Sequence, residues 1–288
     1  MVIKMKKIIA LILALLMCTF CFVSCGDKAD EPANTDANDT TADTADAGDS
    51  DLAYIKDKGT MIIGITDFEP MDFLGADGDW TGFDAELAKL VCEKLGVTPI
   101  FQEISWDAKE TELAGKYIDC IWNGLTVNAD REAAMSMSDK YMLNKQVVVI
   151  READAEKYTD LDSLAAATVA AESGSAGEDA IAASLPDANY IEKDVQIDAL
   201  TELKSLTVDA AVLDYTMAYY LINKEGSDFG DLKILDIDIA DEEFYAIAFR
   251  KGSDATANVN GILAELADAG TLRDLAAEYG LADAIVIG

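Results

Sequence analysis

The chain has 288 residues, of which 55 are acidic and 22 basic, and its formal net charge at pH 7 is −33. This balance argues against nucleic acid as a partner, because phosphate backbones are bound by patches of lysine and arginine. The sequence has no histidine, which excludes serine–histidine catalysis and histidine-ligated zinc. Acid–base catalysis by imidazole is excluded as well, and we expect no metal ion and no other cofactor.

The first 24 residues have the pattern of a secretory signal peptide. Lys4, Lys6 and Lys7 give a positive start, and the apolar run from Ile8 to Val23 is too short for a stable membrane span. Cys25 follows this run at the position of the lipid-bearing cysteine in bacterial lipoproteins. We therefore expect Cys25 to carry lipid and to anchor the protein on the outer face of the cell membrane, with a plain secreted form as the alternative.

Residues 25–51 form a second segment with a composition of its own. Asp, Ala, Thr, Asn and Gly predominate there, and almost none of these side chains could be buried in a core. We expect a disordered tether that its acidic residues keep extended. It would hold the folded part, residues 52–288, away from the membrane surface.

The folded part begins with strands that alternate with helices. Apolar strands are predicted at Met61–Ile65 and Thr98–Ile104. Between them a helix is predicted to begin at Phe83 and to end at Gly96, because apolar side chains recur there at helical spacing. This alternation predicts a mostly parallel sheet covered by helices.

Two nearly identical copies of one short sequence motif come next. Thr111-Glu112-Leu113 recurs as Thr201-Glu202-Leu203, and each copy leads to a polar strand tip, Asn123–Thr126 or Asp214–Thr216. Ligands bind beyond the carboxyl ends of strands in open α/β sheets, so two similar lobes with facing tips predict a cleft, with chance similarity as the alternative. The predicted helices and strands of the two copies are helix Thr111–Gly115 with strand Ile118–Trp122, and helix Ala199–Leu206 with strand Ala210–Leu213.

The second half of the chain continues the alternation. An amphipathic helical region, broken at Gly270, is predicted from Asn258 to Leu281. The elements predicted before the second copy of the motif are a short helix at Leu161–Leu164, a strand at Thr168–Ala171, a helix at Ala176–Ser184 and a strand at Tyr190–Ile191.

Short motifs in a characteristic order run from Met61 to Tyr279. They are Ile63-Gly64-Ile65, Glu69-Pro70-Met71-Asp72-Phe73, Gly82-Phe83-Asp84, Leu113 with Gly115 and Asp119, Asn123-Gly124-Leu125-Thr126, Arg131, Met137-Ser138-Asp139 with Tyr141, Asp160-Leu161, Ser173-Gly174-Ser175, Asp209-Ala210 with Asp214, Tyr245-Ala246-Ile247-Ala248 and Arg250-Lys251-Gly252. Together they resemble the family 3 extracellular solute-binding proteins, which capture amino acids for ABC importers.

The resemblance implies a two-lobed, type II periplasmic-binding-protein fold of the α/β class. Lobe 1 would comprise residues 52–145 and 246–288, and lobe 2 residues 146–245. The chain would cross between the lobes twice, near Gln146–Val149 and near Phe244–Ala248, so that these segments form a hinge. Closure about the hinge would trap the ligand.

The same resemblance agrees with the chemistry of an α-amino acid. Its carboxylate and ammonium lose water when a cleft closes, and each then needs a charged or hydrogen-bonding partner. Arg131 matches the family's carboxylate ligand, with Gly124 and Thr126 completing the cradle, and Asp214 matches the ligand of the ammonium.

Selection of the ligand's side chain involves further positions. Phe68 and Trp106 match the aromatic walls of the family's site. Asn123 has two interpretations, a hydrogen bond to the ligand or a cap of its own strand. Glu172 suggests a cationic or polar ligand side chain, or else an ordinary solvated acid, and Ser175 with the Ala176 N–H could cradle the carboxylate from the other lobe.

We expect a monomeric receptor that captures a polar or charged α-amino acid and delivers it to an ABC permease in the membrane. Cys92 and Cys120 are expected to be buried small hydrophobes, with a disulfide as the alternative. Two other functions remain open. One is a dehydratase on the same fold, with Glu172 as a general acid, and the other is a sensor ectodomain.

Overall fold

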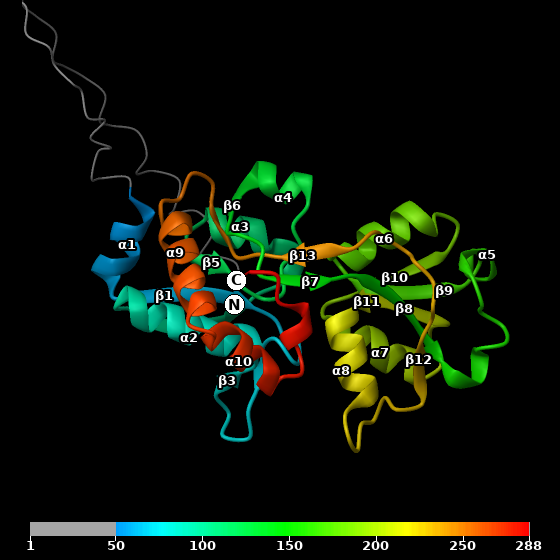
Figure 1. The fold of residues 1–288 in the computed structure, drawn as a ribbon. Coiled ribbons are helices and arrows are strands. Elements are labelled where there is room, and N and C mark those ends of the chain that lie inside the picture. The colour runs from blue at the N-terminus through cyan, green and yellow to red at the C-terminus, as the bar shows by residue number, and fades with distance from the viewer. Residues whose placement is uncertain (1–49, 288) are drawn as a thin grey trace, which may run out of the picture. The chain divides into compact units, whose positions relative to one another are not determined.

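Two five-stranded sheets form the centres of two lobes (Figure 1). The computed structural model describes residues 50–287, all of which belong to one compact unit. The predicted signal segment, Cys25 and residues 26–49 of the predicted tether lie outside the described residues. Ser50 and Asp51, the last two residues of that tether, instead start a helix, because the Ser50 side chain accepts a hydrogen bond from Ala53 N.

The first lobe contains a sheet with the strand order β4-β1-β5-β14-β6. Its strands are β1 (Thr60–Ile65), β4 (Thr98–Glu103), β5 (Cys120–Ile121), β6 (Met135–Met137) and β14 (Ala248–Arg250). A small hairpin, β2 (Phe73–Leu74) with β3 (Trp80–Thr81), lies outside this sheet.

The second lobe contains a sheet with the strand order β10-β9-β11-β8-β12. Its strands are β8 (Gln146–Arg151), β9 (Thr168–Glu172), β10 (Asn189–Lys193), β11 (Ala210–Asp214) and β12 (Leu232–Ile234). The register brings Asp214 of β11 opposite Gln146 of β8, so both side chains lie at the end of this sheet.

Both sheets are mixed, which corrects the expectation of mostly parallel sheets. In the first lobe β1 is parallel to β4 and β5, whereas β14 is antiparallel to β5 and β6. In the second lobe β9 is parallel to β10 and β11, whereas β8 is antiparallel to β11 and β12. The antiparallel members β14 and β8 are the strands that enter each lobe directly from the other lobe, without a preceding crossover helix.

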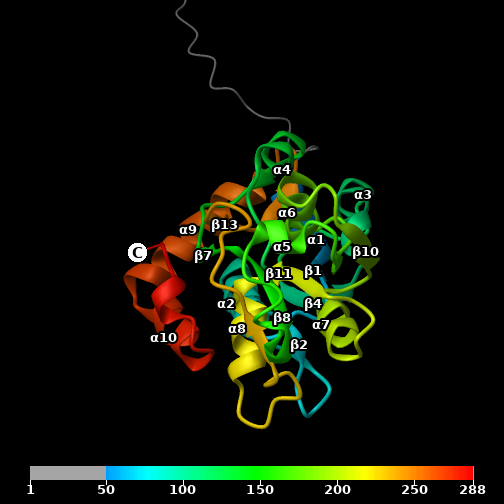
Figure 2. The same ribbon diagram turned by 90° about the vertical axis from the view of Figure 1, so that its right-hand side faces the viewer.

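Helices cover both faces of each sheet (Figures 1 and 2). Those of the first lobe are α1 (Asp51–Lys58), α2 (Phe83–Leu95), the short 3-10 turn η1 (Trp106–Ala108), α3 (Lys109–Ala114), α4 (Ala129–Ala134), α9 (Ala255–Asp268), α10 (Thr271–Glu278) and η3 (Ala282–Ala284). Those of the second lobe are η2 (Glu152–Asp154), α5 (Leu161–Leu164), α6 (Ala176–Ser184), α7 (Gln196–Lys204) and α8 (Tyr215–Asn223).

Successive side chains of β8 point to opposite faces of the sheet, so this one strand contributes to two hydrophobic cores. Val148 and Ile150 pack in a cluster with Ile181 of α6. Val147 and Val149 point to the opposite face, into the cluster that contains Leu200 of α7 and Met217 of α8. A strand that is apolar on both faces is typical of a sheet covered on both sides.

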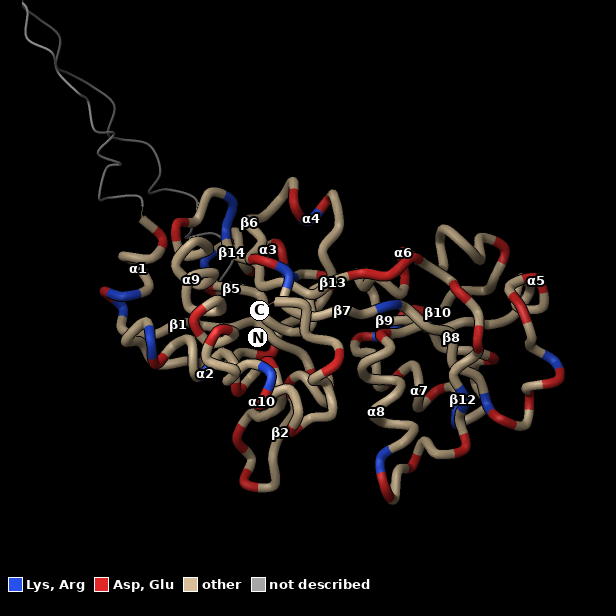
Figure 3. Tube along the Cα trace, in the orientation of Figure 1, with Lys and Arg blue, Asp and Glu red and all other residues tan. Residues whose placement is uncertain are grey.

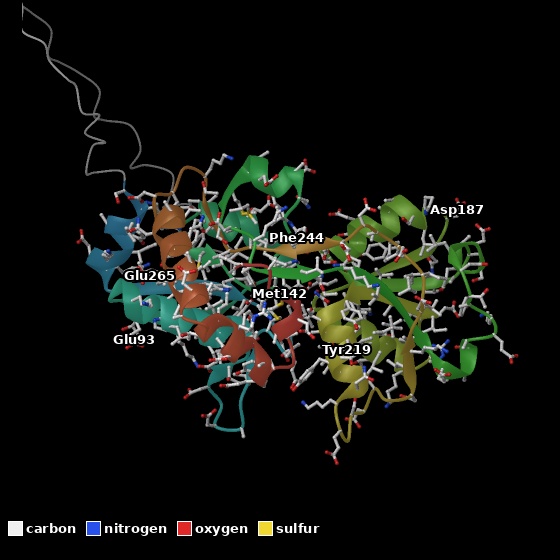
Figure 4. All side chains as sticks on the ribbon, viewed as in Figure 1. Glu93, Met142, Asp187, Tyr219, Phe244 and Glu265 are labelled. Atoms are coloured by element: carbon white, nitrogen blue, oxygen red, sulfur yellow. The ribbon has the colours of Figure 1, made fainter. Side chains whose placement is uncertain are left out.

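The lobes are joined by a two-stranded ribbon of β7 (Met142–Asn144) and β13 (Glu243–Tyr245). Figure 4 labels Met142 and Phe244 on these strands, between the lobes. The expected crossing at Gln146–Val149 was placed slightly too late, because these residues already pair with β11 in the second sheet. The crossing expected from Phe244 includes most of β13.

Several further expectations concern the described residues. Cys92 and Cys120 are both buried and free, as expected for small hydrophobic residues.

Within residues 50–287, no helix combines the length and apolarity needed to cross a membrane. The same range holds no group of three or more histidine, cysteine, aspartate or glutamate residues able to bind a metal ion. Acidic residues outnumber basic ones along the trace (Figure 3).

Candidate functional site

Arg131 is a buried basic residue that reaches from the first lobe to the second. It lies in the first turn of α4, where the side chain of the N-cap residue Asn128 accepts a hydrogen bond from Arg131 N at 2.9 Å. The guanidinium is buried, with Nη1 donating to Thr126 O at 2.7 Å and Nη2 donating to Gly174 O at 3.2 Å. Burial lowers the pKa of Arg131. The nearby acids Asp179, Glu243 and Asp214 act in the opposite direction, because they favour the charged form.

Asp214 ends β11 in the second lobe and is also buried. Its carboxylate accepts hydrogen bonds from four side chains. Burial, followed by the nearby Glu243 carboxylate, raises the pKa of Asp214 to about 7. The four donors are Tyr245 Oη at 2.8 Å, Gln146 Nε2 at 3.0 Å, Asn144 Nδ2 and Gln196 Nε2.

The donors around Asp214 come mostly from the connection between the lobes. Asn144 ends β7, Tyr245 ends β13 and Gln146 begins β8. Glu243, also on β13, shares two of them, since its Oε1 accepts from Asn144 and Gln146 at 2.7 Å each. Lobe movement and the hydrogen bonding of Asp214 therefore depend on the same short ribbon.

Glu172 is a second buried acid at the edge of the second sheet. It ends β9, is 2% exposed, and its Oε1 has no hydrogen-bond partner among the described residues. Burial, followed by Asp214, raises the pKa of Glu172 to about 8, although Lys109, Gln196 and Arg131 act in the opposite direction. A buried carboxylate oxygen without a partner can accept a hydrogen bond from a ligand.

Gly124 shapes the first-lobe tip instead of offering its amide to a ligand. Its N–H donates to Asp84 Oδ2 at 2.7 Å, which corrects the expectation that this amide completes a carboxylate cradle. Its φ of +55° and the Phe68 ring beside it leave no space for a Cβ. Phe68 is buried between this tip and Tyr245, whose ring it meets edge-on at a centroid distance of 6.4 Å.

Asn123 takes the second of its two expected roles. Its Oδ1 accepts from Thr66 N and Thr66 Oγ1 at 3.0 and 2.7 Å, and its Nδ2 donates to Thr66 O and Asp72 Oδ2 at 3.1 and 2.7 Å. Every hydrogen-bonding position of the amide therefore serves the first lobe itself. The side chain holds the end of β1 against the strand tip.

Thr126 of the first lobe and Ala176 of the second line one cavity, and Ser175 directly precedes Ala176 at the start of α6. Thr126 Oγ1 donates to Glu243 Oε1 at 2.9 Å, and Ser175 Oγ accepts from Glu178 N at 3.2 Å as the N-cap of α6. Thr126, Ala176 and Glu243 help to line a cavity of about 530 Å³. The lobes touch where Gly174 meets Arg131 and Lys109, and we call this contact, with the nearby Glu172 and Asp214, the seam. Trp106, the remaining predicted residue, is buried on its first-lobe side, next to Lys109.

The structure adds residues that the sequence did not indicate. Lys109 begins α3, and its Nζ donates to Trp106 O at 3.0 Å and to Gly174 O at 2.9 Å. Asn144, Gln146, Gln196 and Glu243 surround Asp214. Two of these had a visible signal, because Asn144 and Gln146 are the polar residues that precede the apolar run Val147–Ile150. A lysine at a helix start gives no such signal.

Known proteins resemble this chain in sequence and in fold. Residues 61–282 match the family described as bacterial extracellular solute-binding proteins, family 3. The arginine-binding extracellular protein ArtP of Bacillus subtilis is 29% identical over 233 residues, which cover 79% of this chain and 89% of ArtP. The L-cystine-binding protein TcyJ of Escherichia coli is 25% identical over 234 residues, which cover 81% of this chain and 86% of TcyJ.

Solved structures give the same result for the fold. The crystal structure of an ABC uptake transporter substrate-binding protein from Streptococcus pneumoniae, with bound histidine, superposes with a TM-score of 0.76. The two sequences are 27% identical, and the alignment covers 83% of this chain and 100% of the other. The match confirms the predicted two-lobed α/β fold of the type II class.

Proposed function

The chain belongs to the bacterial extracellular solute-binding proteins of family 3, and we propose that it captures a polar or charged α-amino acid for an ABC importer. The observation that carries this proposal is the burial of Arg131 and Asp214 in one seam between the lobes. The first belongs to α4 of the first lobe and the second ends β11 of the second lobe. Asp214 is one of the acids whose charge favours the ionised form of Arg131, so the two groups are electrostatic neighbours.

This arrangement suits a zwitterion. The planar fork of Arg131 can hold a carboxylate with two parallel hydrogen bonds, in place of its present acceptor Gly174 O. Asp214 can hold an ammonium, and the ligand's positive charge would stabilise the ionised form of this carboxylate. Both ligand groups would thus keep a partner of opposite charge after they lose water.

The ligand's side chain would meet a mixed surface. Phe68 and Trp106 offer aromatic walls, and the unpartnered Oε1 of Glu172 offers an acceptor. A side chain with an N–H donor or a positive charge would satisfy this oxygen. The names of the relatives agree with a polar or charged ligand, since they bind arginine, cystine or histidine.

Closure about the β7–β13 ribbon would trap the ligand. We propose residues 52–145 and 246–288 as one moving body and residues 146–245 as the other. In the described structure the lobes already touch, since Gly174 meets Arg131 and Lys109. A ligand must therefore enter from a more open arrangement, and tighter binding to the closed arrangement would drive the motion.

The remaining parts of the proposal concern the protein's surroundings. Residues 1–24 would direct export, and Cys25 would carry the lipid that anchors the monomeric receptor beside its permease. The protein would perform no chemistry itself. A turnover assay with a prephenate-like compound tests the dehydratase alternative, and product release by the wild type but not by Glu172→Gln would contradict this part of the proposal.

Isothermal titration against the twenty amino acids, ornithine and cystine tests the main proposal. The protein would start at Gly26, which keeps every described residue. We expect sub-millimolar binding of one chemical class, and a loss of at least about 100-fold in Arg131→Met and in Asp214→Asn, since each variant leaves a ligand charge unpaired. Arg273→Met and Asp198→Asn change exposed residues by the same substitutions and should bind normally. Absence of binding by every α-amino acid would overturn the proposal.

A further inference from the structure

Lys109 is a buried lysine in the seam between the lobes. It is 4% exposed, although lysine is almost never fully buried without a partner. Its stem and ammonium lie over the indole of Trp106, with Nζ 4.9 Å from the ring centroid. Two backbone carbonyls, of Trp106 and Gly174, accept hydrogen bonds from Nζ. Both acceptors are neutral, so neither of these hydrogen bonds balances the positive charge.

Gly174 O is the point on which two cations converge. It accepts from Lys109 Nζ at 2.9 Å and from Arg131 Nη2 at 3.2 Å. The two nitrogens can therefore be no farther apart than the sum of these distances. Only a glycine allows this approach, because residue 174 has a φ of +72° and a Cβ there would lie 3.0 Å from Asp107 Cα.

Two full positive charges on one carbonyl oxygen are poorly neutralised. A carboxylate supplies a negative charge and two oxygens, and it could accept from both nitrogens at once. Glu172, a buried acid on which both cations act, does not fill this role, since its Oε1 has no partner within residues 50–287. At Gly174 O the two cations therefore share a neutral acceptor instead of a carboxylate.

We propose that Lys109 is a second cation of the ligand's carboxylate site, acting beside Arg131. The inference rests on the proposed amino-acid function and adds to it a residue that the family's motifs do not indicate. In this structure Gly174 O lies between the two cations and accepts a hydrogen bond from each. When the ligand enters, its α-carboxylate takes that position and binds both Lys109 and Arg131.

The charge state of Lys109 makes this contact measurable. Burial, followed by the positive charge of Arg131, lowers the pKa of Lys109 to about 8, while Glu110, Glu172 and Asp107 act in the opposite direction. A bound carboxylate would raise this pKa, so ligand binding near pH 8.5 would be coupled to proton uptake by Lys109. Glu172 and Asp214 also titrate near this pH, and the ligand's ammonium would make them release protons. The contribution of Lys109 is therefore the difference between the wild type and a variant without the amine.

Lys109→Met removes the ammonium and keeps a long apolar side chain. Titration at pH 7.0 with the amino acid that the wild type binds should show a loss of about 10- to 100-fold in affinity. Lys56→Met is the matched control, because it removes the same charge from an exposed position on α1 and should leave the affinity unchanged.

A second measurement separates a carboxylate contact from a role in holding the lobes together. Titrations at pH 8.5 in buffers of different ionisation enthalpy give the number of protons bound with the ligand. This number should be larger for the wild type than for Lys109→Met, and the difference should be greatest for a direct contact, since a lysine that still held Gly174 would feel the ligand's charge only from a distance. Equal affinities, or weaker binding with equal proton numbers, would overturn the inference. A wild type that binds no α-amino acid would instead overturn the proposed function.

Discussion

Buried charges from both lobes meet in one seam, and they are only partly neutralised by one another. Arg131 and Lys109 are the buried cations, Asp214 and Glu172 are the buried acids, and the half-buried Glu243 lies beside Asp214. Burial raises the pKa of Asp214 to about 7 and that of Glu172 to about 8, so the ionised form of each carboxyl is disfavoured. A zwitterionic ligand would supply the missing partners. Burial of these acids opposes their ionisation, as is expected where a binding site is kept at a cost in stability.

Glu172→Gln tests this instability at a single residue. In the folded state the pKa of Glu172 is raised above its ordinary value of 4.5, so ionisation favours the unfolded chain between pH 4.5 and about 8. The wild type should therefore lose stability as the pH rises through this window, and the amide should remove that loss. We expect Glu172→Gln to raise the unfolding free energy of the ligand-free protein by roughly 2 kcal/mol at pH 7.

Urea unfolding at pH 5, 7 and 8 measures this effect. The gain in Glu172→Gln should be small at pH 5 and larger at pH 7. Glu192→Gln is the control, since it makes the same change at an exposed position of the neighbouring strand β10. A gain that is independent of pH, or that Glu192→Gln shares, would contradict the assignment of an unpaired buried acid.

At the scale of single residues, the sequence predicted the positions of those candidate binding residues that belong to a family motif. Arg131 and Asp214 are placed at opposite sides of one seam, as expected, although their binding roles stay predictions. The interpretation of Gly124 was wrong in one respect, because nothing in the sequence shows that Asp84 takes its amide. Lys109 and the donors around Asp214 were missed, because their burial follows from packing between segments far apart in the chain.

Short elements place these residues, and α4 is the clearest case. It has six residues, Ala129–Ala134, and its first turn carries Arg131. So short a helix has little stability of its own, and it depends on the cap that Asn128 provides. The direction of the Arg131 side chain therefore depends on a residue that need not touch the ligand.

Asn128→Ala should loosen this helix start. Loss of the cap is expected to lower the unfolding free energy by about 1 kcal/mol and to weaken ligand binding several-fold, because Arg131 would be held less firmly. Asn128→Ser keeps a capping oxygen and should preserve most of both. Chemical denaturation and titration calorimetry on the two variants test the argument. An alanine variant that binds like the serine variant would show that the cap does not position Arg131.

The predicted elements were accurate where the local pattern was strong. The helix predicted at Ala176–Ser184 has these limits in the structure, and α2 begins at Phe83 and is followed by Gly96 in the left-handed conformation. The helix predicted at Ala199–Leu206 is instead Gln196–Lys204, because Val195 before it gives no side-chain cap that would mark the start. The strand predicted at Ile118–Trp122 pairs only at Cys120–Ile121.

At the scale of the whole molecule, the family and the two-lobed fold were predicted and are confirmed. The mixed sheets were not predicted, since residue patterns show that a strand is buried but not in which direction it runs. That direction follows from the connection between the lobes. The chain passes from β7 into β8, and on its return from β13 into β14, so both strands enter their sheets without a crossover helix and run antiparallel.

The lobes also meet at an ion pair remote in sequence from the charged seam. Lys224 Nζ, just after α8 of the second lobe, lies 2.6 Å from Glu69 Oε1 of the first lobe. The lysine side chain is 45% exposed, so the pair should contribute at most about 1 kcal/mol to the contact. That amount is small for folding but is comparable to the differences that set the rates of lobe opening.

Lys224→Met should therefore speed ligand release with little effect on folding. Opening breaks the Lys224–Glu69 pair, whereas unfolding is governed by the cores of the two lobes, so we expect a dissociation rate about 2- to 5-fold higher and an unchanged melting temperature. Stopped-flow displacement of the ligand measures the rate. Lys233→Met is the matched control, because Lys233 pairs with Glu152 inside the second lobe and should not resist opening. Equal release rates for the two variants would mean that the ion pair is already broken in the solution structure or does not limit opening.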